Sequence, residues 1–474
     1  MVFSSLIFIS AFLPATVALY VMLPSRWRNA LLVSASLVFY AWSGLRALLL
    51  VVALVALNFA LGRMIDAKEG AARRRLLVLA LSVNIAVFVV VKYSGFLLEN
   101  ANAVLALVSD LQVPVWSIPL PLGISFFTFH IISYLVDVHR RSVTSQPSPI
   151  SFALYIVNFP QLIAGPIIRY RQIADQLGTR AVRFADIDAG VVRFTVGLVK
   201  KLLIADPIGA IADQIFGVPP GQLGVDTAWL GVVCYALQIY FDFSGYSDMA
   251  IGLARMFGFR FPENFDYPYA ATSMREFWRR WHMTLSAWFR DYVYIPLGGN
   301  RDGGWATTRN LWIVFFLAGA WHGASWTFIV WGLWQGLFLS LERLKPVEAM
   351  FARLPGLVRH AYVVLVVLIG WVFFRAPDLP NALGYLGRMV GLGVDDSGLP
   401  LIVRVSTPMA MLLAAAAVMS LPLWPRLRGA FMQWQERGGA VADTARAAVI
   451  GCAVLLALGV MGGQDYSPFI YFRF

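Results

Sequence analysis

Two histidines in the middle of the sequence have the residue type and the surroundings for acid–base chemistry. His322 lies in GAWHGASWTFIVWGLWQG (Gly319–Gly336), and the run from Asn310 to Leu341 around it contains no Asp, Glu, Lys or Arg. An imidazole titrates near neutrality, so it can both take and give a proton. A polar side chain in so apolar a run costs free energy unless it has a partner or a task. His322 is therefore either a hydrogen-bonded core residue or a residue that takes part in acid–base chemistry.

The second histidine, His282, lies in REFWRRWHMTLSAWFRDYVYIPLGGNR (Arg275–Arg301). At 100° per residue an apolar arc on one side of a helix contains Phe277, Trp278, Trp281, Leu285, Trp288 and Phe289, and the other side contains Arg275, Arg279, Arg280 and Arg290. This pattern predicts an amphipathic helix that lies along the cytoplasmic interface of a membrane. It is either an anchor alone or an anchor whose boundary histidine reaches into the bundle.

Glycines surround His322 at a spacing that favours close helix packing. Gly319 and Gly323 form one G-x-x-x-G pair, and Gly332 and Gly336 form another. Such pairs let a neighbouring backbone approach closely. We therefore expect a tightly packed helix that presents one imidazole, with Trp321 and Trp326 as its bulky neighbours.

Other polar residues stand in apolar surroundings between about residues 120 and 340. FDFSGYSDMAIGLARMFGF (Phe241–Phe259) contains Asp242, Ser244 and Asp248. Asp248 and Arg255 are seven residues apart and can pair along one helical face. These residues either form a structural ion pair or line a polar cavity.

Two further features precede them. His130 and Asp137, also seven apart, fit an interhelical hydrogen bond near the cytoplasmic end of a helix. Pro160 and Pro166 break helical hydrogen bonding. A broken backbone at membrane depth is tolerated only where it is buried in protein or lines a wet cavity. The prolines therefore mark either a re-entrant segment or an interfacial loop.

The composition predicts an all-α, polytopic integral membrane protein. The 474 residues are 59% hydrophobic and 14% charged, against about 25% charged in soluble domains. Apolar runs predict roughly 10–12 membrane-embedded helices. Basic residues at Arg26–Arg28, Arg63–Arg75 and His139–Arg141 predict cytoplasmic loops. The net charge of +12 reflects this bias and attraction to the lipid bilayer, so we expect no nucleic-acid partner. The two cysteines lack metal-ligand spacing, and no metal site is expected.

The distribution of polar residues also predicts the domain organisation. We expect a single transmembrane domain over residues 1–474. Residues 120–341 would form its catalytic core, and residues 1–116 and 342–474 would be mostly scaffold helices.

Several long motifs together resemble the membrane-bound O-acyltransferase (MBOAT) family, in its alginate O-acetyltransferase branch. They are YFDFSGYSDMAIGLARMFGF, PENFDYPYAATSMREFWRRWHMTLSAWFRDYVYIPLGGNR, GAWHGASWTFIVWGLWQG and the terminal SPFIYFRF. The resemblance implies a multi-pass protein of the bacterial inner membrane, with interfacial and re-entrant helices around a central funnel.

The resemblance also implies an activity. An acetyl group would pass from a cytoplasmic thioester, acetyl-CoA or an acyl carrier, to an exopolysaccharide such as alginate or cellulose. Transfer would be direct or through periplasmic acetyltransferase partners, and the thioester would be a substrate rather than a bound cofactor. The alternatives are a D-alanyl transferase of the same family and, from another class, a transporter or flippase.

The family's two characteristic histidines match His322 and His282. His322 would be the general base, and His282 would orient the donor or stabilise the oxyanion. Two further groups of residues are expected to take part by their position. The phosphates of the donor, or an acidic carrier, would be held by Arg279, Arg280 and Arg290. The cavity would be lined by Asp242, Ser244, Asp248, Trp321 and Trp326. The arginines also fit an ordinary bias of positive charge towards the cytoplasm.

Overall fold

A computed structural model of the chain describes residues 1–392, 405–463 and 469, and every regular element in these residues is a helix. The helices belong to two compact units. The first unit comprises Met1–Phe194 and Met249–Pro262, and the second comprises Thr195–Asp248 and Glu263–Phe474. The expected core, residues 120–341, therefore draws residues from both units, whereas His282 and His322 both lie in the second.

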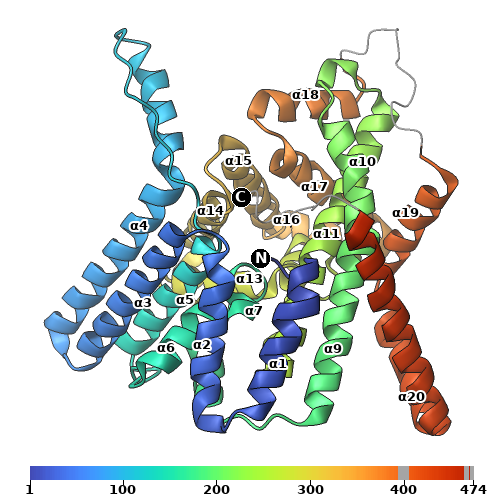
Figure 1. Cartoon of the computed structure of the whole chain (residues 1–474). Coiled ribbons are helices and arrows are strands. Elements are labelled where there is room, and N and C mark those ends of the chain that lie inside the picture. Colours follow the sequence, from blue (N-terminus) through green and yellow to red (C-terminus); the bar gives the residue numbers. More distant parts are fainter. Residues whose placement is uncertain (393–404, 464–468, 470–474) are drawn as a thin grey trace. The chain divides into compact units, whose positions relative to one another are not determined.

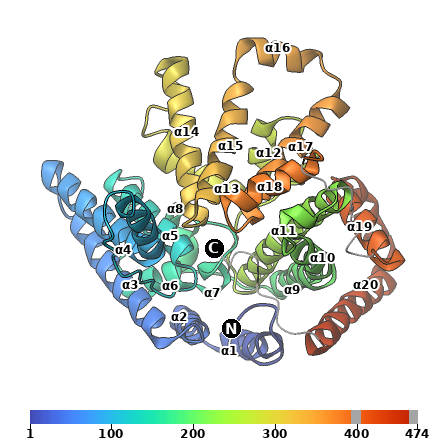
Figure 2. The same cartoon turned by 90° about the horizontal axis from the view of Figure 1, so that it is seen from above.

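The first unit contains the N-terminal helices. In chain order they are η1 (Phe8–Phe12), α1 (Leu13–Met22), α2 (Ser25–Ala41), α3 (Leu45–Asp66), α4 (Gly70–Leu105), α5 (Ile124–His139), α6 (Pro149–Val157), α7 (Phe159–Leu162), α8 (Tyr170–Gly178) and most of α9 (Phe184–Val199). Helices α3, α4 and α5 pack side by side (Figure 1, Figure 2).

The second unit contains the elements that carry the two histidines. They are η2 (Lys200–Ala205), α10 (Asp206–Phe216), η3 (Pro220–Gln222), most of α11 (Val225–Met256), η4 (Pro268–Ala270), α12 (Met274–Arg280), α13 (Met283–Phe289), η5 (Arg290–Tyr294), α14 (Gly303–His322), α15 (Trp326–Leu341), α16 (Lys345–Arg353), α17 (Gly356–Arg375), α18 (Leu379–Met389), α19 (Thr407–Met419) and α20 (Trp424–Gly463). Helices α14 and α15 form a hairpin, and α15 packs on α17 (Figure 1).

Within the described residues, four helices are long and apolar enough to cross a membrane. They are Leu45–Asp66, Gly70–Leu105, Gly356–Arg375 and Arg437–Gly463, and shorter apolar helices cover Phe8–Met22, Ile124–His139, Trp326–Leu341 and Thr407–Met419. A helix needs about 20 apolar residues to span a bilayer. The prediction of an all-α, multi-pass membrane protein is confirmed.

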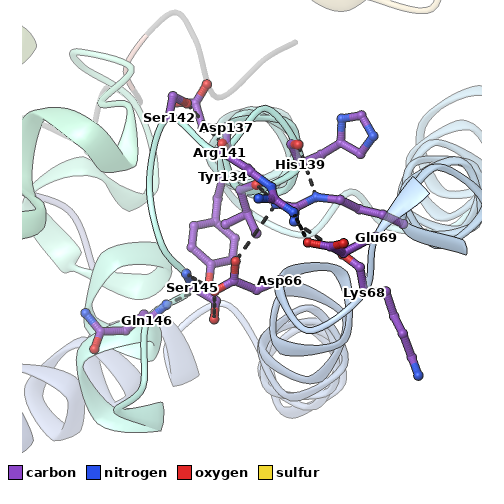
Figure 3. Close-up of polar contacts among 12 residues, drawn as sticks. Asp66, Lys68, Glu69, Tyr134, Asp137, His139, Arg141, Ser142, Ser145 and Gln146 are labelled. Atoms are coloured by element: carbon purple, nitrogen blue, oxygen red, sulfur yellow. Dashed lines mark hydrogen bonds and ion pairs between the residues drawn. The ribbon is translucent and has the colours of Figure 1, made fainter. Parts of the chain in front are cut away.

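Two of the predicted cytoplasmic segments meet in the first unit (Figure 3). Arg141 forms an ion pair with Glu69, with 2.6 Å between nitrogen and oxygen. The guanidinium of Arg73 donates to the backbone carbonyl of His139 at 3.1 Å. Ser145 donates to Asp66 from its backbone N–H (2.9 Å) and from its hydroxyl (2.8 Å). Segments in contact at helix ends lie on the same side of a membrane, as the charge pattern predicts.

His130, Pro160 and Pro166 are all buried in the first unit. The Nε2 atom of His130 accepts a hydrogen bond from the backbone N–H of Ile168 at 3.2 Å, and the ring is fully buried. His130 is therefore a hydrogen-bonded core residue as expected, but its partner lies in non-helical backbone between α7 and α8, so the bond is not interhelical. Pro160 lies in the four-residue α7, and the irregular backbone after it contains Pro166. Residues 158–168 are all buried, which is the condition under which broken backbone is stable at membrane depth.

Candidate active site

His322 is the last residue of α14 and is enclosed by aromatic rings. Its imidazole centroid lies 4.9 Å from the ring of Trp331 on α15 and 5.0 Å from that of Phe374 on α17. The neighbouring Trp321 ring is 4.8 Å away. Only 4% of His322 is exposed. Three helices therefore hold this imidazole in an apolar, almost dry environment.

The hairpin explains how His322 comes to lie against Trp331. A β-carbon on Gly332 would lie 3.1 Å from the Cα atom of Gly319 and would collide with the carbonyl oxygen of Phe315. Only glycine therefore allows α15 to approach α14 so closely. The predicted close approach is confirmed, and the approaching backbone is the second half of the same apolar run.

That run, Asn310–Leu341, is two helices rather than one. The chain leaves α14 after His322, and α15 begins at Trp326. Ser325 caps the new helix, because its hydroxyl oxygen accepts a hydrogen bond from the backbone N–H of Thr327 at 3.3 Å. His322 thus lies at a helix end, where a side chain is less enclosed by its own helix than in a helix interior.

The prediction of one amphipathic helix through Arg275–Arg290 is wrong. Helix α12 ends at Arg280, Trp281 is extended, and His282 has left-handed backbone angles (φ 43°, ψ 54°) before α13 begins. The cause is Asn264. Its carbonyl oxygen accepts from the backbone N–H of Met283 at 2.9 Å, and its side-chain Oδ1 accepts from that of Thr284 at 3.3 Å. These two N–H groups are bonded outside the helix that would otherwise continue.

Asn264 also holds the imidazole of His282. The distance from His282 Nδ1 to Asn264 Oδ1 is 3.1 Å, and the Thr284 hydroxyl donates to the same oxygen at 2.8 Å. His282 is fully buried, and its ring is perpendicular to that of Phe243 at a centroid distance of 4.7 Å. Burial lowers the pKa of His282 to about 3, so its imidazole is neutral at physiological pH. Sequence reasoning did not identify Asn264, although it lies in the PENFDYPY motif.

The two histidines belong to one aromatic cluster. The Trp321 ring, 4.8 Å from His322, is 6.2 Å from His282. The structure therefore brings together both predicted catalytic histidines and Trp321. Trp326, by contrast, is 51% exposed at the start of α15.

Several buried polar atoms in this cluster lack a hydrogen-bond partner among the described residues. They are Nε2 of His282, Nε1 of Trp331, Nε1 of Trp278 and Oε1 of Gln335. Buried polar groups are nearly always satisfied, so each exception requires an explanation. Trp331 is the clearest case, because the ring that carries this N–H lies against His322 and is 1% exposed.

The three predicted donor-binding arginines differ in their contacts. Arg280 is bonded within the protein, to Glu276 at 2.9 Å and to Asp266 at 3.5 Å. Arg290 is exposed and pairs with its neighbour Asp291 at 2.8 Å. Arg279 is exposed and has no ion pair with any described residue. Arg279 is therefore the most available of the three for a donor.

The predicted cavity residues Asp242 and Asp248 form ion pairs with two lysines. Asp242 pairs with Lys201 at 2.8 Å, and Asp248 pairs with Lys200 at 2.7 Å. The proposed pairing of Asp248 with Arg255 is not what the structure shows, because Arg255 pairs with Asp186 at 3.5 Å. Lysines on η2, which sequence reasoning did not consider, supply these cations.

The Asp242–Lys201 pair lies close to the last described residue, Phe469. Ser244, near them on α11, is buried at 2% exposure. Lys201 also pairs with Asp206 at 2.6 Å, and its ammonium lies 4.7 Å from the ring of Phe469. Phe469 belongs to the SPFIYFRF motif, whose other residues lie outside the described part of the chain.

Comparison with known proteins shows a family and close relatives. Residues 75–373 match the model of the MBOAT, membrane-bound O-acyltransferase family. The chain is 38% identical to a probable alginate O-acetylase AlgI of Pseudomonas putida over the full length of both chains. It is 43% identical to the probable alginate O-acetylase AlgI of Azotobacter vinelandii, over 83% of this chain and 79% of the relative. A peptidoglycan O-acetyltransferase of Helicobacter pylori is 37% identical over 83% of this chain and 80% of the relative.

Proposed function

The chain belongs to the membrane-bound O-acyltransferase family and is an O-acyltransferase, and from this premise we propose that it transfers acetyl groups from a thioester to hydroxyls of an exopolysaccharide. The observation that carries the proposal is the buried His322 beside the Trp331 N–H, which has no hydrogen-bond partner in the described part of the chain. Together they offer a proton acceptor and a hydrogen-bond donor in one apolar site. In a transporter or flippase, a buried proton acceptor beside a buried hydrogen-bond donor would have no function.

The proposed reaction needs one proton acceptor. His322 takes the proton of the acceptor hydroxyl as the oxygen attacks the thioester carbonyl carbon. A C–O bond forms, and the carbonyl oxygen becomes an oxyanion. The C–S bond then breaks, and the imidazolium of His322 returns its proton to the departing sulfur. The products are an ester and a free thiol.

Trp331 is suited to stabilise the oxyanion. Its N–H is buried and has no partner among the described residues. A fixed donor in a dry site requires no reorganisation when charge develops on the substrate, and a single donor of this kind is typically worth about 10²–10³ in rate.

We propose the acyl donor from the exposed positive charge of the protein and the acceptor from the names of its relatives. Exposed Arg279 would contact the phosphates of acetyl-CoA or the acidic surface of an acyl carrier at the cytoplasmic side. Relatives named for alginate and for peptidoglycan acetylation support a polysaccharide hydroxyl as acceptor. Transfer across the bacterial inner membrane to alginate or cellulose is either direct or through a periplasmic acetyltransferase partner.

The test is turnover of labelled acetyl thioesters by the purified protein in nanodiscs. Acetyl-CoA and an acetylated carrier protein would each be supplied with and without alginate oligomers. His322→Ala should lower the rate by about 10²–10⁴-fold, and His139→Ala, at the polar end of α5 in the first unit, should not. Equal rates in wild type and His322→Ala would refute the base assignment. A wild type that consumes neither donor would refute acetyl transfer.

A further inference from the structure

The side-chain amide of Asn264 can have only one orientation. The backbone N–H of Thr284 is 3.3 Å from one of its terminal atoms, and a backbone N–H can only donate. That atom must therefore be the oxygen, Oδ1. The other terminal atom, Nδ2, donates to the hydroxyl of Ser247 at 3.1 Å. Both ends of the amide are thus assigned by their partners.

This orientation determines which nitrogen of His282 carries the proton. Nδ1 of His282 faces Asn264 Oδ1 at 3.1 Å, and an oxygen that already accepts from Thr284 can only accept. Nδ1 must therefore be the donor. A neutral imidazole has one N–H, so Nε2 holds a lone pair. Nε2 is buried and has no partner within the described residues.

We infer that Asn264 is a positioning residue that holds His282 in its Nδ1–H tautomer, so that Nε2 accepts a hydrogen bond from the substrate. The inference deepens the proposed function and rests on it for the identity of that substrate. A neutral His282 cannot donate from Nε2 to an oxyanion. Of the two roles that the sequence left open, oxyanion stabilisation is therefore excluded for this tautomer. A saccharide acceptor has hydroxyls besides the one that His322 deprotonates, and we assign a neighbouring hydroxyl of the acceptor as the hydrogen-bond donor to Nε2.

The backbone of His282 supports the same role for Asn264. A non-glycine residue with left-handed angles persists only where its surroundings enforce the conformation. Asn264 bonds both backbone N–H groups that follow His282, those of Met283 and Thr284. One residue therefore sets the backbone turn, the ring position and the tautomer.

Nitrogen NMR of histidine-labelled protein in lipid tests the tautomer without any substrate. The His282 signal is assigned by its loss in His282→Gln. Wild type should show a protonated Nδ1 and an unprotonated Nε2, and Asn264→Ala should lose this preference. A wild-type His282 that carries its proton on Nε2 would overturn the inference. Because this readout needs no turnover, it stands even if the proposed function fails.

Titration of the same nitrogen signals tests the role of Asn264 in a second way. Among the described residues, the ring and hydrogen-bond contacts of the His282 imidazole are with Phe243, Trp321 and Asn264, and none of these side chains ionises. Asn264→Asp places a carboxylate at Nδ1, so His282 binds a proton at higher pH than in wild type. The pH at which the His282 signals titrate should move up by about 1–3 units.

The matched control for this experiment is Thr284→Val. It removes the hydroxyl that shares Asn264 Oδ1 and leaves the His282 contact, so the titration of the His282 signals should stay in place. An unmoved His282 titration in Asn264→Asp, or the same movement in both variants, would refute the positioning role.

Discussion

Gly332 packs directly against Gly319, so that a β-carbon on Gly332 would lie 3.1 Å from the Cα atom of Gly319. We expect Gly332→Ala to force α14 and α15 apart and to destabilise the protein by about 1–3 kcal/mol, the usual range for overpacking. Thermal unfolding in detergent measures the change. Gly304→Ala on α14 is the control, because a β-carbon there meets nothing within 4 Å. Equal melting temperatures for the two variants would contradict the prediction.

Trp331→Phe tests the contribution of the Trp331 N–H separately from that of its aromatic ring. Phenylalanine keeps an aromatic ring on the helix and removes the buried donor, so the rate of acetyl transfer should fall by about 10²–10³-fold. Trp334→Phe on the same helix is the comparison. Its Nε1 already donates to the carbonyl of Val366 at 2.9 Å, and its loss should affect stability more than rate. A similar fall in rate for both variants would remove Trp331 from the mechanism.

Arg279 and Arg280 should respond differently to removal of their charge. Arg279→Gln leaves the internal contacts intact and should raise the KM for acetyl-CoA up to about fivefold, equivalent to ~1 kcal/mol for an exposed charge pair. The increase should shrink at high salt. Arg280→Gln breaks the contacts to Glu276 and Asp266 and should lower the melting temperature instead. Unchanged kinetics in Arg279→Gln would place donor binding elsewhere.

Glu342 should make the stability of the protein depend on pH. It follows α15 and accepts hydrogen bonds from the backbone N–H groups of Met274 (2.6 Å) and Arg275 (3.3 Å), which begin α12. Burial raises the pKa of Glu342 above its ordinary value, against the lowering effect of these bonds. The folded state therefore binds its proton more tightly than the unfolded state. Stability from this group is present at low pH and is lost as pH rises through the raised pKa.

Glu342→Gln should remove that component of the pH dependence. Denaturant unfolding between about pH 4 and 8 should show a flatter stability curve for the variant than for wild type. Parallel curves would mean that the carboxyl does not titrate differently on folding.

The sequence predicts the membrane class and identifies both histidines as candidate site residues because these signals are local. Apolar runs, glycine pairs and a histidine without charged neighbours can be identified from a few adjacent residues. The apolar face that contains Trp281, Trp288 and Phe277 is likewise predicted by periodicity, but these side chains are buried within the protein instead of forming a membrane anchor, and the expected helix is broken.

The features that sequence reasoning missed depend on partners far along the chain. The break at His282 arises because Asn264, 18 residues earlier, takes up the backbone N–H groups that follow it. Helical periodicity on both sides of the break remains compatible with one helix. Asp248 similarly pairs with Lys200, 48 residues away, rather than with a residue on its own helix. Only tertiary packing decides between such partners.

The contact between Phe469 and Lys201 bears on how the protein is made. The ring lies 4.7 Å from the Lys201 ammonium and 4.6 Å from the Tyr246 ring, and it is almost fully buried. During synthesis η2 and α11 are produced long before residue 469 leaves the ribosome. The buried ammonium of Lys201 therefore gains its contact with the Phe469 ring only after residue 469 has been synthesised. Nascent chains stalled before residue 469 should expose this part of the second unit to membrane proteases.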